Sequence, residues 1–441
     1  QQARAEIAEG IDLEDYVTRF VADTNKRGPV IFVAADGGGL KACYWTMLNL
    51  YRLDTMDLFD GHVFALSGAS GGTIGLSMYN YLKARNALDE EIPDFIKAIG
   101  EGNFLSGDFT GLLTRFPINY WPNLPDFEPK EWDDRMESMA RAYFRIVGRE
   151  SSRFNYDSIR QQPFWYPWTV QPDLPLLIVN TARAEDGLLG TVTPLRDTIL
   201  HGSIHLTRNS KGGVISYPDA TFLSNRFPIA SPAARIIGKG HFLDAGSADN
   251  SGINSIYGLL RVLKSRQAQD TTGNSVYDRL FERGIVVLSL RNAQSRYVRD
   301  EFLGLLDSMN RYPYKSEFSA NTGVAVNTGL TGVPISWDDY LRSDVPQHLG
   351  IVHEYLTINL PFRLRKGDVF SALGGELRYP DLDRDRKELN SLINHSMRDS
   401  SYAVMPPLGR LLAYPVREYM REMLEHPRVD AVYEELRELK K

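Results

Sequence analysis

The sequence has little of three things that mark particular protein classes. It contains a single cysteine, Cys43, among 441 residues, so no intramolecular disulfide can form and a reducing compartment fits the chain. No apolar run approaches the roughly 18 residues that a membrane-spanning helix needs. No signal peptide is visible either. The formal net charge of -6 supplies no basic field of the kind that binds nucleic acid.

These absences leave the class of globular enzymes and binding domains. Hydrophobic residues make up 43% and charged residues 24%, a balance that predicts an ordered chain. The sequence begins abruptly at Gln1, as the interior of a longer protein does. We therefore expect a cytoplasmic or peripherally membrane-associated protein, or the soluble domain of a longer membrane-anchored one. Cys43 is interpreted as a small buried hydrophobe rather than a reactive thiol.

The first third of the chain alternates short apolar runs with helical segments. Residues 29–35 (PVIFVAA) lead into DGGG, and residues 62–66 (HVFAL) lead toward GASGG. Helices are expected at 40–53 and 73–87. A strand, a helix and a strand in this space form a crossover unit, which predicts parallel strands. The predicted fold class is therefore α/β, with a central, mostly parallel sheet flanked by helices.

The remainder of the chain is patterned less clearly. Strands are expected at 176–180, 241–243 and 285–290, and helices at 133–147, 253–264 and 417–424. Residues 1–28 are interpreted as a lead-in and residues 29–441 as one domain. Within it, residues 103–168 are rich in aromatic residues and proline, which indicates a helical insertion capping the sheet edge. Residues 295–384 show no pattern that predicts an architecture.

A G-x-S-x-G pattern occupies residues 68–72, between an expected strand and an expected helix. A nucleophile on such a turn needs small neighbours, here Gly68, Gly71 and Gly72, because the chain bends sharply there. The N-terminus of the following helix favours negative charge developing beside Ser70. The pentapeptide alone also arises by chance, but its position between strand and helix favours Ser70 as a nucleophile.

A glycine turn lies one crossover earlier, at Asp36, Gly37, Gly38 and Gly39. Acyl transfer builds negative charge on a carbonyl oxygen, and the backbone amides of a tight glycine turn can stabilise it. The alternatives are a plain strand-to-helix turn or a phosphate cradle. Against the cradle, neither a G-x-G-x-x-G nor a Walker lysine pattern is present.

An acidic residue ends a late expected strand, in the run Asp244-Ala245-Gly246. At the end of a strand of a parallel sheet, Asp244 can approach a serine on a neighbouring strand end. The alternative role is an ordinary cap for the helix expected to begin near Ser251.

Taken together, the three motifs resemble the patatin-like phospholipase family. That family has a DGGG-type oxyanion loop followed by a basic residue, a G-x-S-x-G elbow one helix later and a D-G-[GA] acid; here these read DGGGLK, GASGG and DAG. Residues 225–236 (NRFPIASPAARI) and 249–252 resemble the segments before and after the acid. Residues 104–135 and 406–416 resemble larger bacterial members more loosely. Two departures are Lys41, where arginine is commoner, and Ala245, where glycine is usual.

The resemblance implies a lipid acyl hydrolase that works through a Ser-Asp dyad. Asp244 would accept the proton of Ser70, and Ser70 would attack an ester carbonyl. The amides of the loop, Gly37 and Gly38 with Gly39 beside them, would hold the oxyanion until water clears the acyl-enzyme. The residues expected to support the site are Asp36, Lys41, Gly68, Gly71, Gly72 and Gly246.

No cofactor or metal is needed for these steps, and the sequence has no H-E-x-x-H or similar ligand cluster. The expected partners are a lipid or acyl-ester substrate and a membrane surface, with no nucleic acid. The insertion carries Trp121, Phe164, Trp165, Tyr166 and Trp168, and such aromatic residues suit either a bilayer interface or plain packing.

Two other functions compete with this one. The first is an α/β-hydrolase with a Ser-His-Asp triad, its histidine drawn from His348, His353 or His395. Spacing disfavours it, since only one helix fits between Gly39 and Gly68. The second is a lipid-binding or signalling module with a vestigial dyad, which the DAG departure and the insertion would suit. Acyl transfer to an acceptor other than water is a further variant of the chemistry.

Overall fold

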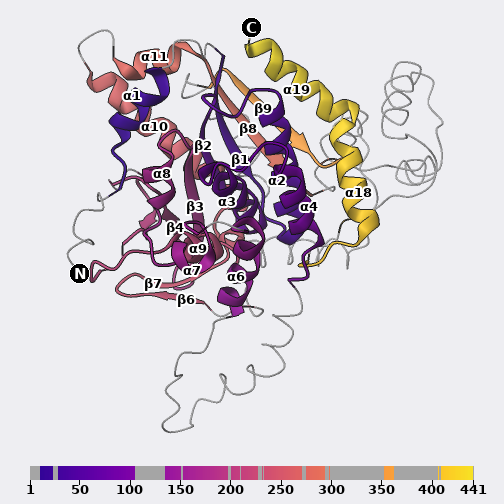
Figure 1. Ribbon diagram of the computed structural model, residues 1–441. Helices are drawn as coiled ribbons and strands as arrows, with labels where there is room; N and C mark the ends of the chain where they lie inside the picture. Colours follow the sequence, from indigo (N-terminus) through magenta and orange to yellow (C-terminus); the bar gives the residue numbers. More distant parts are fainter. Residues whose placement is uncertain are drawn as a thin grey trace, which may run out of the picture.

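The computed structural model describes residues 10–22, 28–104, 135–149, 152–196, 200–208, 210–226, 231, 233–270, 275–293, 297, 352–361, 406 and 409–440. These residues form a nine-stranded sheet with helices on both faces (Figure 1). The strand order is β5-β4-β3-β2-β1-β8-β9, and β6 pairs with β7, which pairs with β3.

The strands are β1 (Val30–Ala35), β2 (Val63–Gly68), β3 (Leu176–Arg183), β4 (Leu189–Val192), β5 (Ile204–His205), β6 (Ala234–Ile236), β7 (Gly240–Leu243), β8 (Ile285–Arg291) and β9 (Glu354–Asn359). The α-helices are α1 (Leu13–Ala22), α2 (Gly39–Thr55), α3 (Ser70–Ala84), α4 (Ile92–Glu101), α6 (Arg135–Val147), α7 (Tyr156–Ile159), α8 (Tyr166–Val170), α9 (Tyr217–Leu223), α10 (Ile253–Gln269), α11 (Val276–Glu282), α18 (Tyr414–Glu422) and α19 (Pro427–Lys440). Two short 3-10 helices are η2 (Ala245–Ser247) and η4 (Met423–Glu425).

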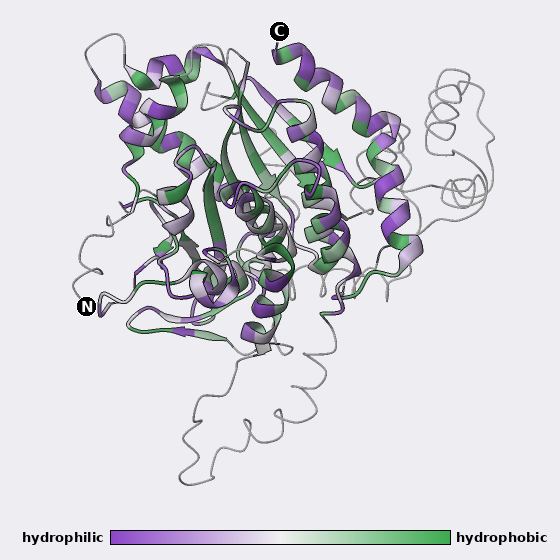
Figure 2. Cartoon of the chain, in the orientation of Figure 1, coloured by the Kyte–Doolittle hydropathy of each residue, from purple (hydrophilic) through white to green (hydrophobic). Residues whose placement is uncertain are grey.

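The centre of the sheet is parallel. β1 pairs in parallel with β2 and β8, β2 with β3, and β8 with β9. Every residue of β1 is buried, as expected for a strand covered on both faces. Ile31 and Val33 pack on the side of α2 and α3, whereas Phe32 and Ala34 pack on the side of α1, α10 and α11. Figure 2 shows the resulting hydrophobic strands at the centre of the molecule. The predicted α/β class with a mostly parallel sheet is confirmed.

Most predicted elements coincide with observed ones. The apolar runs at 29–35 and 62–66 are β1 and β2, and the helices that follow them are α2 and α3. The strands at 176–180, 241–243 and 285–290 are β3, β7 and β8, and the helices at 253–264 and 417–424 fall on α10 and α18. Of the helix at 133–147, residues 135–147 are α6 and the first two lie outside the described residues.

The strand that leads to Asp244 differs from its expected setting. The sequence suggested a strand end of the parallel sheet, but β7 runs antiparallel to β3, with Leu243 opposite Ala182. β4 and β6 were not predicted, and β7 was predicted without its antiparallel pairing, because these strands have only three or four residues each and are partly exposed. β9 lies in the segment for which no architecture was predicted, and it pairs with β8.

The described part of the insertion is helical, in α6, α7 and α8, and of the aromatic residues singled out there, Tyr166 is partly buried and the others fully so. Phe164, Trp165 and Trp168 are at most 3% exposed. The Phe164 ring stacks on that of Tyr217 at 5.3 Å between centroids. These rings therefore pack in the core rather than at a bilayer interface. Trp121 lies outside the described residues.

Cys43 is fully buried within α2, where burial raises the pKa of its thiol. This placement agrees with its interpretation as a core residue. None of the described helices is both long enough and apolar enough to cross a membrane.

The length of β3 determines where the residues that follow β2 and β7 lie. β2 runs alongside β3 until Gly68, which lies opposite Val179. β3 continues beyond that point, and β7 pairs with the continuation at Ala182 and Arg183. Because β4 occupies the other edge of β3, β7 lies on the same edge as β2 and runs toward its end. The residues that follow β2 and β7 therefore meet.

The two glycine turns that follow β1 and β2, at the carboxyl ends of these strands, pack backbone against backbone. A Cβ atom on Gly71 would lie 1.9 Å from the carbonyl oxygen of Gly39, and one on Gly72 would lie 2.5 Å from that of Asp36. Gly409 belongs to the same cluster, since its carbonyl accepts from the amide of Leu40 at 2.8 Å. No side chain of any size fits between the turns at these two positions, which explains Gly71 and Gly72.

We predict that Gly71→Ala lowers the free energy of unfolding by about 3 kcal/mol or more, because the new methyl meets backbone that cannot rotate away. Gly409→Ala is the matched control, since a Cβ there would meet nothing within 4 Å. Urea unfolding of both variants is the measurement. Equal stability of the two would show that the turns can separate without cost.

Candidate active site

Ser70 lies at the tight turn between β2 and α3. Its φ of 48° is in the left-handed region, which is uncommon for a residue with a side chain and costs on the order of 1–2 kcal/mol. Its amide donates to Ser224 Oγ at 2.9 Å. A hydroxyl group on such a turn points away from the strand, as a nucleophile requires.

A buried polar network holds the strand beneath this turn. Asn180 of β3 donates from Nδ2 to Ser67 Oγ at 2.9 Å and to the Gly68 carbonyl at 2.8 Å. Ser67 Oγ donates to the Gly252 carbonyl at 2.8 Å, and Ser255 Oγ donates to Asn180 Oδ1 at 2.6 Å. A fully satisfied network in a low dielectric is rigid. It therefore fixes the backbone on which the strained serine depends.

The two residues predicted as the dyad are in direct contact. Ser70 Oγ donates to Asp244 Oδ2 at 2.7 Å, across 174 positions of sequence. The other carboxylate oxygen of Asp244 accepts from the Gly246 amide at 2.8 Å. Asp244 thus caps η2 with one oxygen and contacts Ser70 with the other, whereas α10, the helix that it was alternatively expected to cap, begins after Gly252. Ser70 is 8% exposed and Asp244 5%, so the pair is largely shielded from water.

Burial sets the protonation of this carboxyl group. It raises the pKa of Asp244 to about 6, against the hydrogen bonds from Ser70 and Gly246 and the charge of Arg410, which lower it. The group is therefore ionised near neutral pH, yet far more basic than an ordinary aspartate.

Asn225 is a neighbour of Ser70 to which the sequence assigned no role. Its Oδ1 lies 3.0 Å from Ser70 Oγ, and it is 7% exposed. The hydroxyl group has one hydrogen, which the closer and charged Asp244 attracts more strongly. Asn225 lies within the segment whose resemblance was noted, directly after Ser224, so its position in that segment was the only available signal.

The glycine loop lies beside the nucleophile. A Cβ on Gly37 would be 3.1 Å from the Cβ of Ser70. The Gly37 amide is engaged, donating to the Asn250 carbonyl at 2.9 Å. No hydrogen bond to the amides of Gly38 and Gly39 is found among the residues that the structure describes. Within the described part of the chain, the Gly37 amide therefore has a partner, whereas those of Gly38 and Gly39 have none.

Asn292, directly after β8, holds the loop from the other side. Its Nδ2 donates to the carbonyls of Gly37 at 2.9 Å and Asp36 at 3.2 Å. Its Oδ1 would be 2.3 Å from a Cβ on Gly38, whose φ is 153°. Asn292 directly follows the carboxyl end of β8, which is the signal that could have identified it.

The remaining predicted residues have structural surroundings consistent with support of the site. Burial lowers the pKa of Lys41, and the charge of the buried Asp36 raises it in part. Ala245 is fully buried, and its amide donates to the Ser224 carbonyl at 3.2 Å. Its methyl group therefore does not prevent the contact between Asp244 and Ser70.

The histidines proposed for a triad do not enter this site in the described part of the chain. His353 accepts from the Ile285 amide at 2.8 Å through Nδ1, at the start of β8 and thus at the opposite edge of the sheet. His348 and His395 lie outside the described residues. Within the described ranges, no group of three or more His, Cys, Asp or Glu side chains is placed to hold a metal ion.

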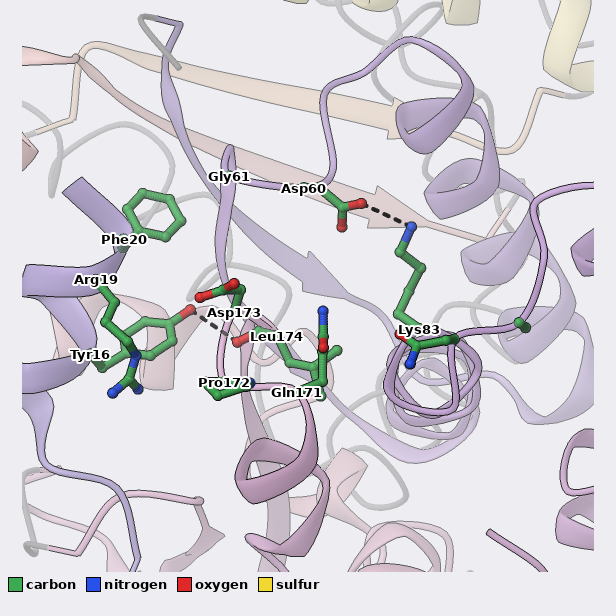
Figure 3. A pocket seen from close by; sticks show the side chains of 12 residues that line it. Tyr16, Arg19, Phe20, Asp60, Gly61, Lys83, Gln171, Pro172, Asp173 and Leu174 are labelled. Carbon is green, nitrogen blue, oxygen red and sulfur yellow. Dashed lines mark hydrogen bonds and ion pairs between the residues drawn. The ribbon is translucent and has the colours of Figure 1, made fainter. Parts of the chain in front are cut away.

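A separate pocket of about 440 Å³ lies at the amino ends of the strands (Figure 3). Its lining includes Tyr16, Arg19 and Asp173, and also Lys83 near the last turn of α3. Lys83 forms ion pairs with Asp54 and Asp60. Ser70 begins the same helix, so the pocket and the candidate dyad are at opposite ends of α3. None of the predicted site residues lines it.

Comparison with known proteins gives similarity to solved structures only. No family model matches the chain, and no curated protein matches it. Human GIVD cytosolic phospholipase A2 is similar at 12% identity and a TM-score of 0.44, and its complex with methyl gamma-linolenyl fluorophosphonate at 13% and 0.43. Both alignments cover 97% of this chain and 62% of the phospholipase chain. VipD from Legionella pneumophila is similar at 11% identity and a TM-score of 0.32, over 84% of this chain and 66% of that one.

We predict that Asp244→Asn stabilises the protein at about pH 8 and has little effect at about pH 4. The pKa of this carboxyl group is raised from 3.8 to about 6 in the folded protein, so folding favours its protonated form. The free energy of unfolding of the wild type therefore falls by up to about 3 kcal/mol as the pH rises from about 4 through about 6. The amide of the variant does not ionise, so its free energy of unfolding does not fall in this way. Thermal unfolding across this pH range is the measurement. A variant that is less stable than wild type at pH 8 would contradict the assigned burial cost.

Proposed function

We propose that the chain is a serine-dependent lipid acyl hydrolase, of the phospholipase A or esterase kind, that cleaves fatty-acyl esters through Ser70 and Asp244. The observation that carries this proposal is the 2.7 Å hydrogen bond from Ser70 Oγ to the buried Asp244 carboxylate. The motif resemblance to patatin-like phospholipases supports the same chemistry.

The direct contact favours a dyad over a triad. In a Ser-His-Asp triad an imidazole lies between hydroxyl group and carboxylate. Here the carboxylate itself occupies the position of the base. An aspartate of ordinary pKa would be a weak base for a serine hydroxyl, whereas a carboxyl group with a pKa of about 6 is better matched to work near neutral pH.

The proposed reaction has two halves. In the first, Asp244 accepts the Ser70 proton as Oγ attacks the ester carbonyl, and the protonated carboxyl group then donates that proton to the departing alcohol oxygen. In the second, Asp244 accepts a proton from water, which attacks the acyl-enzyme, and returns it to Ser70. An acceptor alcohol in place of this water would give acyl transfer.

The oxyanion of each half-reaction would be held by the amides of Gly38 and Gly39. Both precede or begin α2, whose N-terminus adds a favourable dipole. Asn292 and Asn250 would act as positioning residues, since their hydrogen bonds to the Gly37 carbonyl and amide fix the orientation of this loop.

Asn225 would assist the nucleophile. With its amide rotated by half a turn, Nδ2 takes the place of Oδ1 near Ser70 Oγ and can donate to it while Oγ donates to Asp244. After proton transfer, this donor stabilises negative charge on Oγ.

We predict that Ser70→Ala and Asp244→Asn each reduce hydrolysis of a short chromogenic acyl ester by about a thousandfold or more, because each removes a reacting group. His353→Ala is the control and should retain most activity. A fluorophosphonate probe should attach to Ser70 in wild type, and mass spectrometry of the adduct checks the position. Attachment without any turnover would favour the vestigial lipid-binding module instead.

The activity should also depend on pH through the base. Because Asp244 must be ionised to accept the proton, kcat/KM should rise with pH through about 6 and level above it. Initial rates with the same ester, measured where the fold is intact, give the profile. An acid limb centred near the ordinary aspartate pKa of about 4 would indicate that the base is not this buried group.

A further inference from the structure

Exposed hydrophobic side chains are unevenly distributed over the described part of the molecule. The seven large ones are Leu88, Leu188, Val214, Ile237, Leu411, Tyr414 and Leu439. Leu88 follows α3 and Leu439 ends α19, both at the edge where the parallel strands begin. The other five surround the edge where those strands end, which is the edge of Ser70. Figure 1 shows the two edges, with the end of α19 at the top, the β6–β7 hairpin at the lower left and the start of α18 at the right, below α19.

Three of the five lie on adjoining turns, at residues 184–188, 210–214 and 237–240, which we call the wing tip. Leu188, Val214 and Ile237 are each 45–46% exposed there. The Ser210 amide donates to the Ile237 carbonyl at 3.2 Å, and Arg183 Nη1 donates to the Lys239 carbonyl at 3.4 Å. The three turns therefore form one connected surface.

The wing tip projects beyond the candidate active site. β3 extends four residues past the level of Gly68, from Val179 to Arg183, and β7 covers a similar distance from Gly240 to Asp244. At about 3.3 Å per residue, the tip lies roughly 13 Å outward from the dyad. A flat surface that touches the tip would thus face the dyad rather than the opposite edge.

The charge of this region is opposite to that of the chain. Arg183, Arg208, Lys211, Arg235 and Lys239 stand on or beside the three turns. The acidic residues of the three segments 183–188, 208–214 and 234–241 are Glu185 and Asp186, and Asp186 forms an ion pair with Arg183. The ammonium group of Lys239 donates to the His205 carbonyl. The whole chain, in contrast, has a net charge of -6. Cations around exposed aliphatic side chains complement an anionic bilayer surface, because the aliphatic groups can enter the apolar layer while the cations contact the lipid phosphates.

A second apolar point lies on the other side of the dyad. Leu411 is 44% and Tyr414 64% exposed, and both follow Arg410, whose charge acts on Asp244. The same segment contacts the start of α2 through the hydrogen bond of Gly409 with Leu40. A flat surface that contacts the protein at two apolar points, with the dyad between them, has a defined orientation relative to the protein. Contact at one point alone would not define it.

We propose that the wing tip, with Leu411 and Tyr414, docks this edge of the protein onto an anionic lipid bilayer. Leu188, Val214 and Ile237 enter the interface, and the surrounding lysine and arginine side chains bind lipid phosphates. The consequence for catalysis rests on the proposed function, since docking brings Ser70 toward the surface that holds its substrate. The binding itself does not depend on Ser70.

The test is co-sedimentation with vesicles of phosphatidylcholine, with and without about one third phosphatidylglycerol. Wild type and Ser70→Ala should both bind the anionic vesicles, more weakly as salt increases. The triple variant Leu188→Ser, Val214→Ser and Ile237→Ser should bind at least about tenfold more weakly. Its hydrolysis of a soluble ester should stay at the wild-type level, which also reports an intact fold.

The matched control is Leu88→Ser with Leu439→Ser, at the opposite edge, which should bind as wild type does. Absence of vesicle binding by wild type, equal binding by the wing-tip variant, or an equal loss in the control would each overturn the proposal. Binding that depends on the wing tip in a protein without esterase activity would instead retain the docking surface and refute the proposed function.

Discussion

The site depends on one constraint: β3 is longer than the neighbour it shares an edge with. β2 stops at Gly68, and β7 approaches from the opposite direction along the remaining edge of β3. The chain leaves both strands at the same place, which brings Ser70 within 2.7 Å of Asp244. The glycine turns and the asparagine contacts around them all serve to keep this junction closed. If β3 ended at Val179, β7 would have no residue of β3 to pair with, and Asp244 would not be held beside Ser70.

The junction concentrates unfavourable local features, and the surrounding structure offsets them. A serine with positive φ, a carboxylate deprived of water and a backbone contact with no room for a methyl group are each costly. Around them, the buried hydrogen bonds that Asn180 and Asn292 donate and that Ser224 accepts are well formed. Costly local features that gather at one place are typical of positions where function rather than stability decides the residues.

How much of this follows from the sequence depends on the range of the interactions. β1, α2, β2 and α3 are predictable because apolar runs and glycine turns are local signals. Ser70, Asp244 and the glycine loop could be named from their motifs. That the Gly37 amide is already bonded, and that Asn225 and Asn292 contact the site, depends on tertiary contacts between distant segments. The same holds for Phe164 and Trp168, whose burial against α9 no composition could distinguish from exposure at an interface.

The burial of Cys43 has a practical consequence. A thiol reacts as its thiolate, and this one is sealed within α2 with a raised pKa, so reagents in solution have no route to it while the core is closed. As the sole sulfhydryl of the chain, it marks the transient opening of the core with a single chemical signal. The surface of the folded protein therefore has no reactive thiol. A fluorophore or spin label attached through one introduced cysteine would occupy one known position.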